Sequence, residues 1–190
     1  MDGTVWALPH EQALVARAQA EPKAFAAVYD HYYPRVYTYA RYRVNETAIA
    51  EDLTAQIFER VLIRIGDYDP NRAPFAAWLF TIARNTVNDH LRGVQRHPNV
   101  SLDTQYHLVS PEPLPEETAV HRETNAELLA ALGVLSDRER EILALKFAGG
   151  LTNRRIADIV RLNEKNVSVI LYRAVQRLRE RLPPEETSHD

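Results

Sequence analysis

Side chains suited to binding nucleic acid gather in the last quarter of the chain. Lysine, arginine and asparagine recur between residues 152 and 178, at spacings that place them on the outer side of two helices. The positions that can reach a DNA major groove are Lys165, Asn166, Ser168, Val169, Tyr172 and Arg173. Those at the start of the preceding helix, or placed to hold phosphates, are Thr152, Arg154, Arg155, Arg177 and Arg179.

The elements that position these side chains have the pattern of a helix-turn-helix. Thr152 can cap a short helix that runs to residue 160, and Asn163 can cap a longer helix after a tight turn. Before them, Ser136 and Glu139 have capping-box spacing, and two glycines at 149–150 end the helix that this box begins. The pattern favours DNA binding over the alternative, a plain helical hairpin with solvated arginines.

A second polar group lies near the middle of the chain. An arginine, an asparagine and an arginine at positions 84, 88 and 92 are four residues apart, so they share one face of a helix over residues 75–96. The loop before this helix carries an aromatic ring and an amide that could stack on and read an unpaired base. The alternative is a solvated polar face above an ordinary core, and spacing alone favours that alternative. The candidates are Tyr68, Asn71, Arg72, Arg84, Asn85, Asn88 and Arg92.

Composition and motifs argue against an enzyme. The chain has no cysteine, and its seven histidines show no ligand spacing, so we expect no metal site and no cofactor. Neither a glycine-rich phosphate loop nor a nucleophile elbow occurs. No apolar run approaches the roughly 18–20 residues that span a bilayer, and residues 1–20 lack the pattern of a signal peptide. We therefore expect a cytoplasmic protein without direct membrane insertion.

Helical periodicity runs through nearly the whole sequence, and no strand pattern appears. We predict an all-α fold of two small helical domains joined by a flexible linker, the second domain a helix-turn-helix. The predicted segments are a domain over 1–97, a proline-containing linker over 98–129, a domain over 130–183 and a tail over 184–190. Residues 98–130 carry six acids and one arginine, whereas residues 135–182 carry eleven basic and six acidic residues. An acidic linker and a basic end point to different roles for these segments.

Several motifs together resemble the sigma factors of bacterial RNA polymerase. The segment Phe75-Ala76-Ala77-Trp78-Leu79-Phe80-Thr81-Ile82-Ala83-Arg84-Asn85 is similar to the family's F-x-x-W-L-x-x-I-A-R-N motif. Residues 29–37, 50–58, 135–143 and 172–174 resemble further family segments, in family order. The matches cover roughly residues 20–96 and 130–182, without the segment that larger sigma factors carry between these domains. The chain therefore resembles the small extracytoplasmic-function (ECF) type of the sigma-70 family.

The resemblance implies a role for each part. The first domain would dock on the clamp helices of the polymerase largest subunit. Its loop over 68–74 would take up a flipped non-template base of the −10 element. Residues 85, 88 and 92 would contact the same element. The second domain would read the duplex −35 element and sit on the polymerase flap. The linker would run near the RNA exit path, although a merely solvated linker is equally compatible with its sequence. The implied polymerase-binding residues are Asp52, Leu53, Gln56, Phe58 and Glu59.

Some positions depart from the family pattern, and one other function stays open. The family usually has Gln-Glu where this chain has Ala55-Gln56, so one carboxylate at the expected polymerase contact is missing. Arg154-Arg155 replaces common acids, which points to an unusual −35 sequence. The resemblance also implies an anti-sigma partner, which the residues themselves do not show. The alternative function is a helix-turn-helix regulator that binds duplex DNA on its own, without polymerase.

Overall fold

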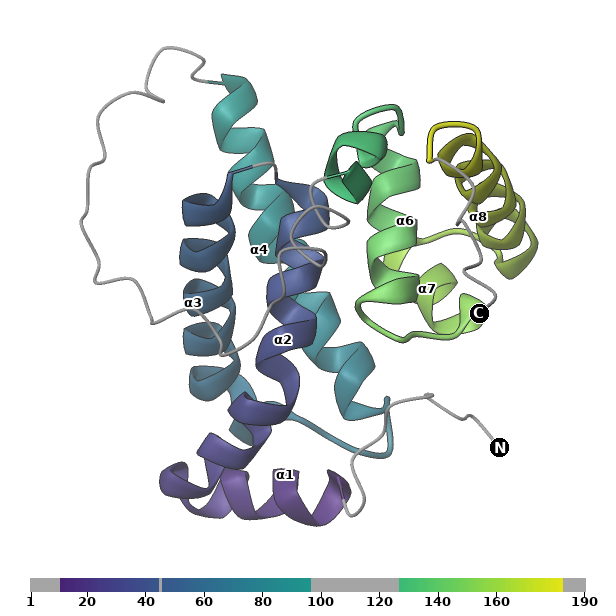
Figure 1. Cartoon of the computed structure of the whole chain (residues 1–190). Coiled ribbons are helices and arrows are strands. Elements are labelled where there is room, and N and C mark those ends of the chain that lie inside the picture. The colour runs from purple at the N-terminus through teal and green to yellow at the C-terminus, as the bar shows by residue number, and fades with distance from the viewer. Residues whose placement is uncertain (1–10, 45, 97–126, 183–190) are drawn as a thin grey trace, which may run out of the picture.

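The computed structural model describes residues 11–44, 46–96 and 127–182, and within these ranges all regular structure is helical (Figure 1). The predicted all-α class is confirmed. The predicted linker lies largely outside the described residues. The helices are α1 (Glu11–Ala20), η1 (Pro22–Ala24), α2 (Phe25–Arg43), α3 (Thr47–Arg64), η2 (Ile65–Asp67), α4 (Phe75–Arg96), α6 (Asp137–Phe147), α7 (Asn153–Val160) and α8 (Glu164–Arg179), with a further helical stretch over 127–132.

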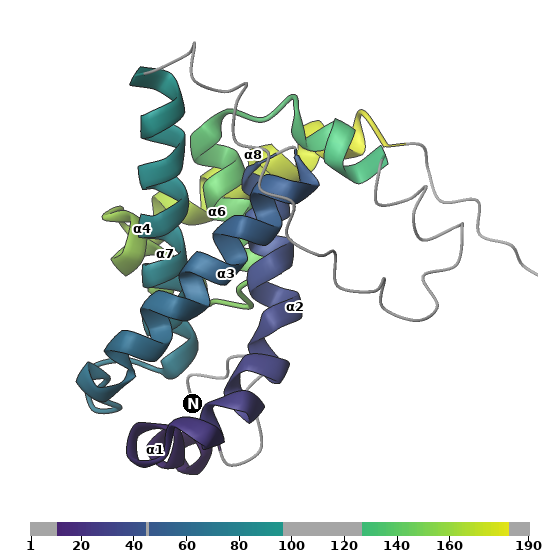
Figure 2. The same cartoon turned by 90° about the vertical axis from the view of Figure 1, so that its left-hand side faces the viewer.

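The N-terminal helices α2, α3 and α4 pack against one another as a three-helix bundle, with α1 lying across one end (Figures 1 and 2). The apolar positions of α3 repeat at helical spacing and are buried, with Leu53, Ile57 and Val61 all at most 1% exposed. Tyr39 and Phe80 join α2 to α4, with their ring centroids 5.6 Å apart. The side-chain amide of Gln19 in α1 donates to the carbonyls of Ile65 and Tyr68, both at 2.9 Å. Helix α1 therefore supports the turn that leads into α4.

The C-terminal helices begin and end at the residues that the sequence indicates. Ser136 and Glu139 form a complete capping box at the start of α6. After α6 the chain turns at Gly149 and Gly150. A Cβ at Gly149 would lie 2.5 Å from the Leu145 carbonyl oxygen, and Gly150 has a φ of 60°. Both positions therefore favour glycine.

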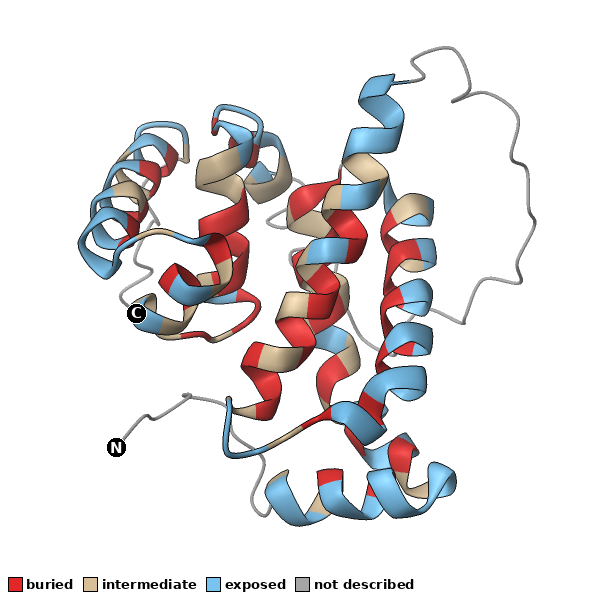
Figure 3. Cartoon of the chain, turned by 180° about the vertical axis from the view of Figure 1, so that it is seen from behind, coloured by how far each residue is buried: buried red, intermediate tan, exposed pale blue. Residues whose placement is uncertain are grey.

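The two groups of helices are packed against each other. Helix α6 lies along α2, and α7 approaches α4. Buried residues line this contact from both sides (Figure 3). One continuous apolar cluster includes Tyr39 and Phe80 from the first group and Ile142 and Leu145 from the second. The sequence predicted two tethered domains but did not predict this contact.

Candidate nucleic-acid interface

Helices α7 and α8 form the predicted helix-turn-helix. The Thr152 hydroxyl accepts a hydrogen bond from the Arg155 amide, and the Asn163 side chain accepts one from the Asn166 amide at 2.7 Å. Arg161, between the helices, has a left-handed backbone with a φ of 56°. The Leu162 amide donates back to the Ala157 carbonyl at 3.0 Å, as in a Schellman motif. The turn is therefore held by local hydrogen bonds on both sides.

The outward side of α8 is free to meet DNA. Its inward residues Val167, Leu171 and Ala174 are buried. Ser168 is exposed, but its hydroxyl already accepts from Asn153 at 3.0 Å and donates to the Glu164 carbonyl. The predicted groove-facing residues are all exposed: Lys165, Asn166, Ser168, Val169, Tyr172 and Arg173.

The residues predicted to contact phosphates differ in their exposure and in their ion-pair partners. Arg154 is exposed, whereas Thr152 and Arg155 are half-buried at the start of α7. Arg177 is exposed but pairs with the Glu139 carboxylate of α6 at 2.9 Å. Burial acts to raise the pKa of Glu139, but hydrogen bonds from Ser136 and the charge of Arg177 lower it overall. Arg177 therefore has an internal anion that a phosphate would have to replace.

The loop between η2 and α4 is built around a buried tyrosine. Tyr68 is 7% exposed, its ring packs 5.2 Å from Phe75 and 5.4 Å from Trp78, and its hydroxyl donates to the Ala73 carbonyl. Burial raises the pKa of Tyr68 to about 12. Of the loop residues expected to meet an unpaired base, Asn71 and Arg72 are exposed. The Tyr68 ring, in contrast, is part of the core in this form of the molecule.

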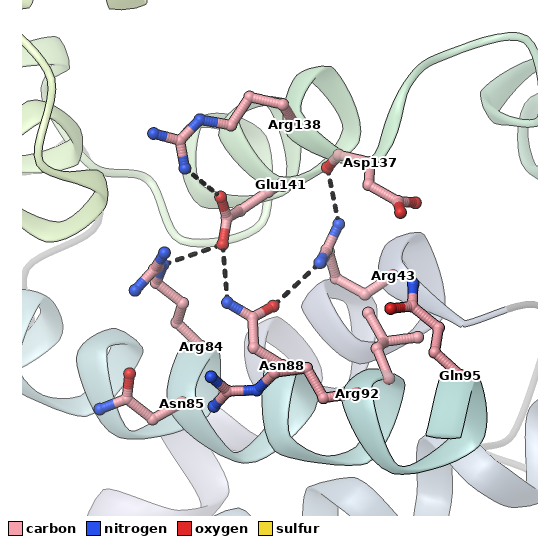
Figure 4. Close-up of a pocket in the computed structure, with 10 residues that line it drawn as sticks. Arg43, Arg84, Asn85, Asn88, Arg92, Gln95, Asp137, Arg138 and Glu141 are labelled. Atoms are coloured by element: carbon pink, nitrogen blue, oxygen red, sulfur yellow. Dashed lines mark hydrogen bonds and ion pairs between the residues drawn. The ribbon is translucent and has the colours of Figure 1, made fainter. Parts of the chain in front are cut away.

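The polar face of α4 lies beside the C-terminal helices, and two of its side chains, Arg84 and Asn88, point toward them (Figure 4). Arg84 donates to the Glu141 carboxylate at 2.8 Å, and Asn88 donates to the same oxygen at 3.0 Å. The other Glu141 oxygen accepts from Arg138 at 2.8 Å. Asn85 and Arg92 are exposed at the edge of a cavity of about 470 Å³, and Arg92 pairs with Asp89 of its own helix.

Glu141 is therefore a buried carboxylate shared by two domains. It is 4% exposed. Burial acts to raise its pKa, but the Asn88 hydrogen bond and the charges of Arg84 and Arg43 outweigh burial and lower the pKa overall. The carboxylate is thus ionised at neutral pH and fully hydrogen-bonded, as a buried charge must be.

The outer side of α3 combines acids with apolar residues. Asp52, Gln56 and Glu59 are exposed, while the other two predicted polymerase contacts, Leu53 and Phe58, are buried in the core. The sequence analysis did not single out Leu62 and Ile63, which are 44% and 74% exposed. Exposed large apolar side chains beside charges are typical of a protein-binding surface.

The structure bears on metal ligands and membrane-spanning helices within residues 11–44, 46–96 and 127–182. In these ranges no three His, Asp or Glu side chains gather as ligands for a metal ion. No helix there is both long and apolar enough to cross a membrane.

Comparison with known proteins identifies the class. The family model described as "Sigma-70 region 2" matches residues 28–97, and the model described as "Sigma-70, region 4" matches residues 125–178. Together they cover more than half of the chain, which belongs to the sigma-70 family of RNA polymerase sigma factors, in its ECF group. It is a non-enzymatic sigma factor that directs RNA polymerase to promoters, and its region 4 helix-turn-helix binds DNA.

Individual relatives agree with this class. The chain is 39% identical to the ECF RNA polymerase sigma factor BldN of Streptomyces coelicolor over 90% of its own length, although the match spans only 66% of that protein. It is 31% identical to the ECF sigma factor ShbA of Streptomyces griseus, over 88% of this chain and 92% of ShbA. Among solved structures it resembles the Bartonella quintana sigma factor RpoE, crystallised with the anti-sigma factor NepR, with a TM-score of 0.65 and 23% identity over 83% of this chain and 96% of RpoE. That likeness shows the fold.

Proposed function

We propose that the N-terminal helices bind core polymerase through the outer side of α3. The exposed Asp52, Gln56 and Glu59 share this surface with the exposed Leu62 and Ile63. A patch of this kind suits a protein partner better than DNA, because its carboxylates would repel phosphates. The expected partner is the clamp of the polymerase largest subunit. Leu53 and Phe58 would support this surface from within the core.

The −10 element would be read by the loop and the polar face of α4. Asn71 and Arg72 project from the loop, while Arg84, Asn85, Asn88 and Arg92 line one side of α4. Amides and guanidinium groups beside an aromatic cluster suit a single strand with one unstacked base, and Asn71, Arg72, Asn85 and Arg92 are exposed. Tyr68 would hold the loop in place as a packing residue, unless its ring leaves the core when DNA binds.

The −35 element would be read by α8 in the major groove. The observation that carries this assignment is the sharp division of α8, with Val167, Leu171 and Ala174 buried and the groove-facing side exposed.

We place the domain boundaries at residues 97 and 130, with an acidic linker between them. The crystallised partner of the related RpoE is an anti-sigma factor, which supports a similar partner for this chain. We expect this sigma factor to act in the cytoplasm.

Transcription with purified components tests this function. The chain and core polymerase are incubated with fragmented genomic DNA of the host, and the transcripts are sequenced. We expect a small set of start sites that share −10 and −35 sequences, and transcription that falls steeply with salt because phosphate contacts release counterions. Tight duplex binding by the chain alone, with no transcription above that of core polymerase, would instead support the stand-alone regulator.

Matched variants separate the two surfaces. Asp52→Asn with Glu59→Gln should weaken core binding at least about tenfold, whereas Glu46→Gln, an exposed acid before α3, should not change it. Asn85→Ala with Arg92→Ala should reduce promoter opening and leave core binding unchanged. Loss of core binding in the second pair would contradict the assignment of α4 to DNA.

A further inference from the structure

The N-terminal helices hold α6 along its whole length. Near its start, Arg43 of α2 donates to the Asp137 carbonyl at 2.8 Å. In its middle, Glu141 accepts from Arg84 and Asn88 of α4. At its end, Arg35 of α2 donates to the carbonyls of Ala148 and Gly149. Carbonyls at a helix C-terminus lack intrahelical donors and carry partial negative charge, so an arginine there is a favourable partner.

These contacts depend on the two groups of helices lying together. Arg43 is 5% exposed and Glu141 is 4% exposed, although both side chains carry a charge. Arg43 also donates to the side-chain oxygen of Asn88 at 3.0 Å, so α2, α4 and α6 share one hydrogen-bonded network (Figure 4). A buried charge needs ion-pair or hydrogen-bond partners, and Glu141 has arginines whereas Arg43 has a carbonyl and an amide oxygen. The network is therefore a specific closed arrangement, which we call the Glu141 network: Arg43, Arg84, Asn88, Arg138 and Glu141.

The same network uses the groups assigned above to the −10 element. Arg84 and Asn88 donate to a carboxylate oxygen, whereas in the promoter complex they would donate to phosphate or base oxygens. One guanidinium and one amide cannot satisfy both partners while α6 covers them. In contrast, the outward sides of α3 and α8 are exposed in the closed arrangement. The contact therefore covers one of the three proposed binding surfaces and leaves the other two open.

Promoter geometry makes the closed arrangement incompatible with reading both elements. Elements centred at −10 and −35 lie about 85 Å apart along straight duplex DNA. A domain of about 100 residues has a radius of gyration of only about 13 Å. Two domains joined by hydrogen bonds of 2.8 to 3.0 Å cannot occupy both elements.

We propose that Glu141 is an internal competitor of promoter DNA: in the free chain it occupies Arg84 and Asn88, closes the two domains on each other and masks the −10 surface until the domains part. The masking rests on the proposed role of α4, whereas the closure rests on the contacts alone.

Closure is measured by energy transfer within the full-length chain. The sequence has no cysteine, so Ala48→Cys and Glu180→Cys, both exposed, give two unique labelling sites. Glu141→Gln leaves three arginines around a neutral side chain and should change the transfer efficiency to that of separated domains. Glu139→Gln is the matched control, because Glu139 lies on the same helix but its carboxylate bonds to Ser136 and Arg177, both on the C-terminal side of the contact. Equal efficiencies for Glu141→Gln and the unsubstituted chain would overturn the proposal.

A second variant guards against a folding defect at residue 141. Arg35→Gln removes the hydrogen bond from α2 to the carbonyl of Ala148 at the C-terminal end of α6. Arg35 lies outside both proposed DNA surfaces. The Arg35→Gln variant should also separate the domains, with unchanged helical circular dichroism. If Glu141→Gln and Arg35→Gln both keep the energy-transfer efficiency of the unsubstituted chain, the proposed closure is overturned.

Masking is measured with a labelled single strand carrying the non-template −10 sequence of a promoter found in the transcription assay. Its affinity for Glu141→Gln should exceed that for the unsubstituted chain at least about tenfold, because apparent affinity scales with the fraction of open molecules. Saturating strand should also open the unsubstituted chain. Opening by Glu141→Gln without any gain in strand affinity would overturn the masking. Absence of strand binding to every open variant would show that the assignment of α4 to the −10 element had failed, while the energy transfer still reported closure.

Discussion

Arg84 has two partners in this scheme, and its substitution should therefore have two opposing effects on DNA binding. Arg84→Ala removes a contact to the −10 strand, which lowers intrinsic affinity. It also removes a contact to Glu141, which raises the fraction of open molecules. Arg92 differs, because its partner is Asp89 of its own helix. Arg92→Ala should lower intrinsic affinity alone.

The size of the change in the closing equilibrium follows from the geometry at Glu141. The Arg84 nitrogen lies 2.8 Å from the carboxylate oxygen, and the two side chains are 23% and 5% exposed. A charge-assisted hydrogen bond contributes about 1.5–3 kcal/mol. Loss of about 2 kcal/mol changes the closing equilibrium roughly 30-fold, since each 1.4 kcal/mol is tenfold. While the closed form predominates, this gain should offset most of the DNA contact that Arg84→Ala removes.

A double-mutant cycle measures the effect. Strand binding is followed by fluorescence anisotropy for Arg84→Ala and Arg92→Ala, each alone and combined with Glu141→Gln. In the Glu141→Gln background both substitutions should weaken binding by a similar factor. In the otherwise unsubstituted chain Arg84→Ala should weaken it far less than Arg92→Ala. The coupling between residues 84 and 141 should be about 2 kcal/mol, and that between 92 and 141 within about 0.5 kcal/mol of zero. Additive effects at both positions would refute the reasoning.

Three further predictions concern stability and pH. Asn163→Ala removes the cap of α8 and should lower the free energy of unfolding by about 1 kcal/mol in urea denaturation, while Asn163→Asp should retain most of it. Arg161→Gly relieves a left-handed backbone that costs about 1–2 kcal/mol for other residues, less about 0.5–1 kcal/mol of glycine entropy, so it should raise the melting temperature slightly. The pKa of Glu141 is lowered in the closed form, so its contribution is complete above the ordinary carboxyl value of 4.5 and is lost as the pH falls through the lowered value. Energy transfer should therefore be constant from pH 8 to about pH 5 and should report opening only in stronger acid.

Local chemistry made much of the fold predictable from the sequence. Ser136, Thr152 and Asn163 were expected to cap helices, and each does. A cap needs only a side-chain oxygen and an amide two or three residues away, so a short stretch of sequence contains all of its information. The stripe on α3 was predictable for the same reason, because its period is set by the helix itself.

The Glu141 network was not predictable in this way. Its hydrogen bonds join residues 53 and 57 positions apart in the chain. In sequence, Glu141 is one acid among alternating charges at the start of a helix, and nothing nearby marks it as buried. Tyr68 shows the same limit, since a tyrosine in a polar loop suggests a free ring. Phe75 and Trp78 bury that ring only because the loop folds back on α4.

The covalent connection allows both arrangements, so the choice between them lies in non-covalent contacts. Residues 97–126 number thirty, and a chain of that length spans at most about 100 Å when fully extended. It can therefore accommodate both a closed form and binding to two elements about 85 Å apart. The outer sides of α3 and α8 are exposed in the closed form, so on the proposed assignments a first encounter with polymerase or duplex DNA would not require opening. Under the proposed role of α4, contact with the −10 strand would require opening, because the strand would have to displace the Glu141 carboxylate from Arg84 and Asn88. Any partner that holds the two domains apart would thus raise strand affinity without touching the strand itself. The gain would equal the reciprocal of the fraction of molecules that are open without that partner.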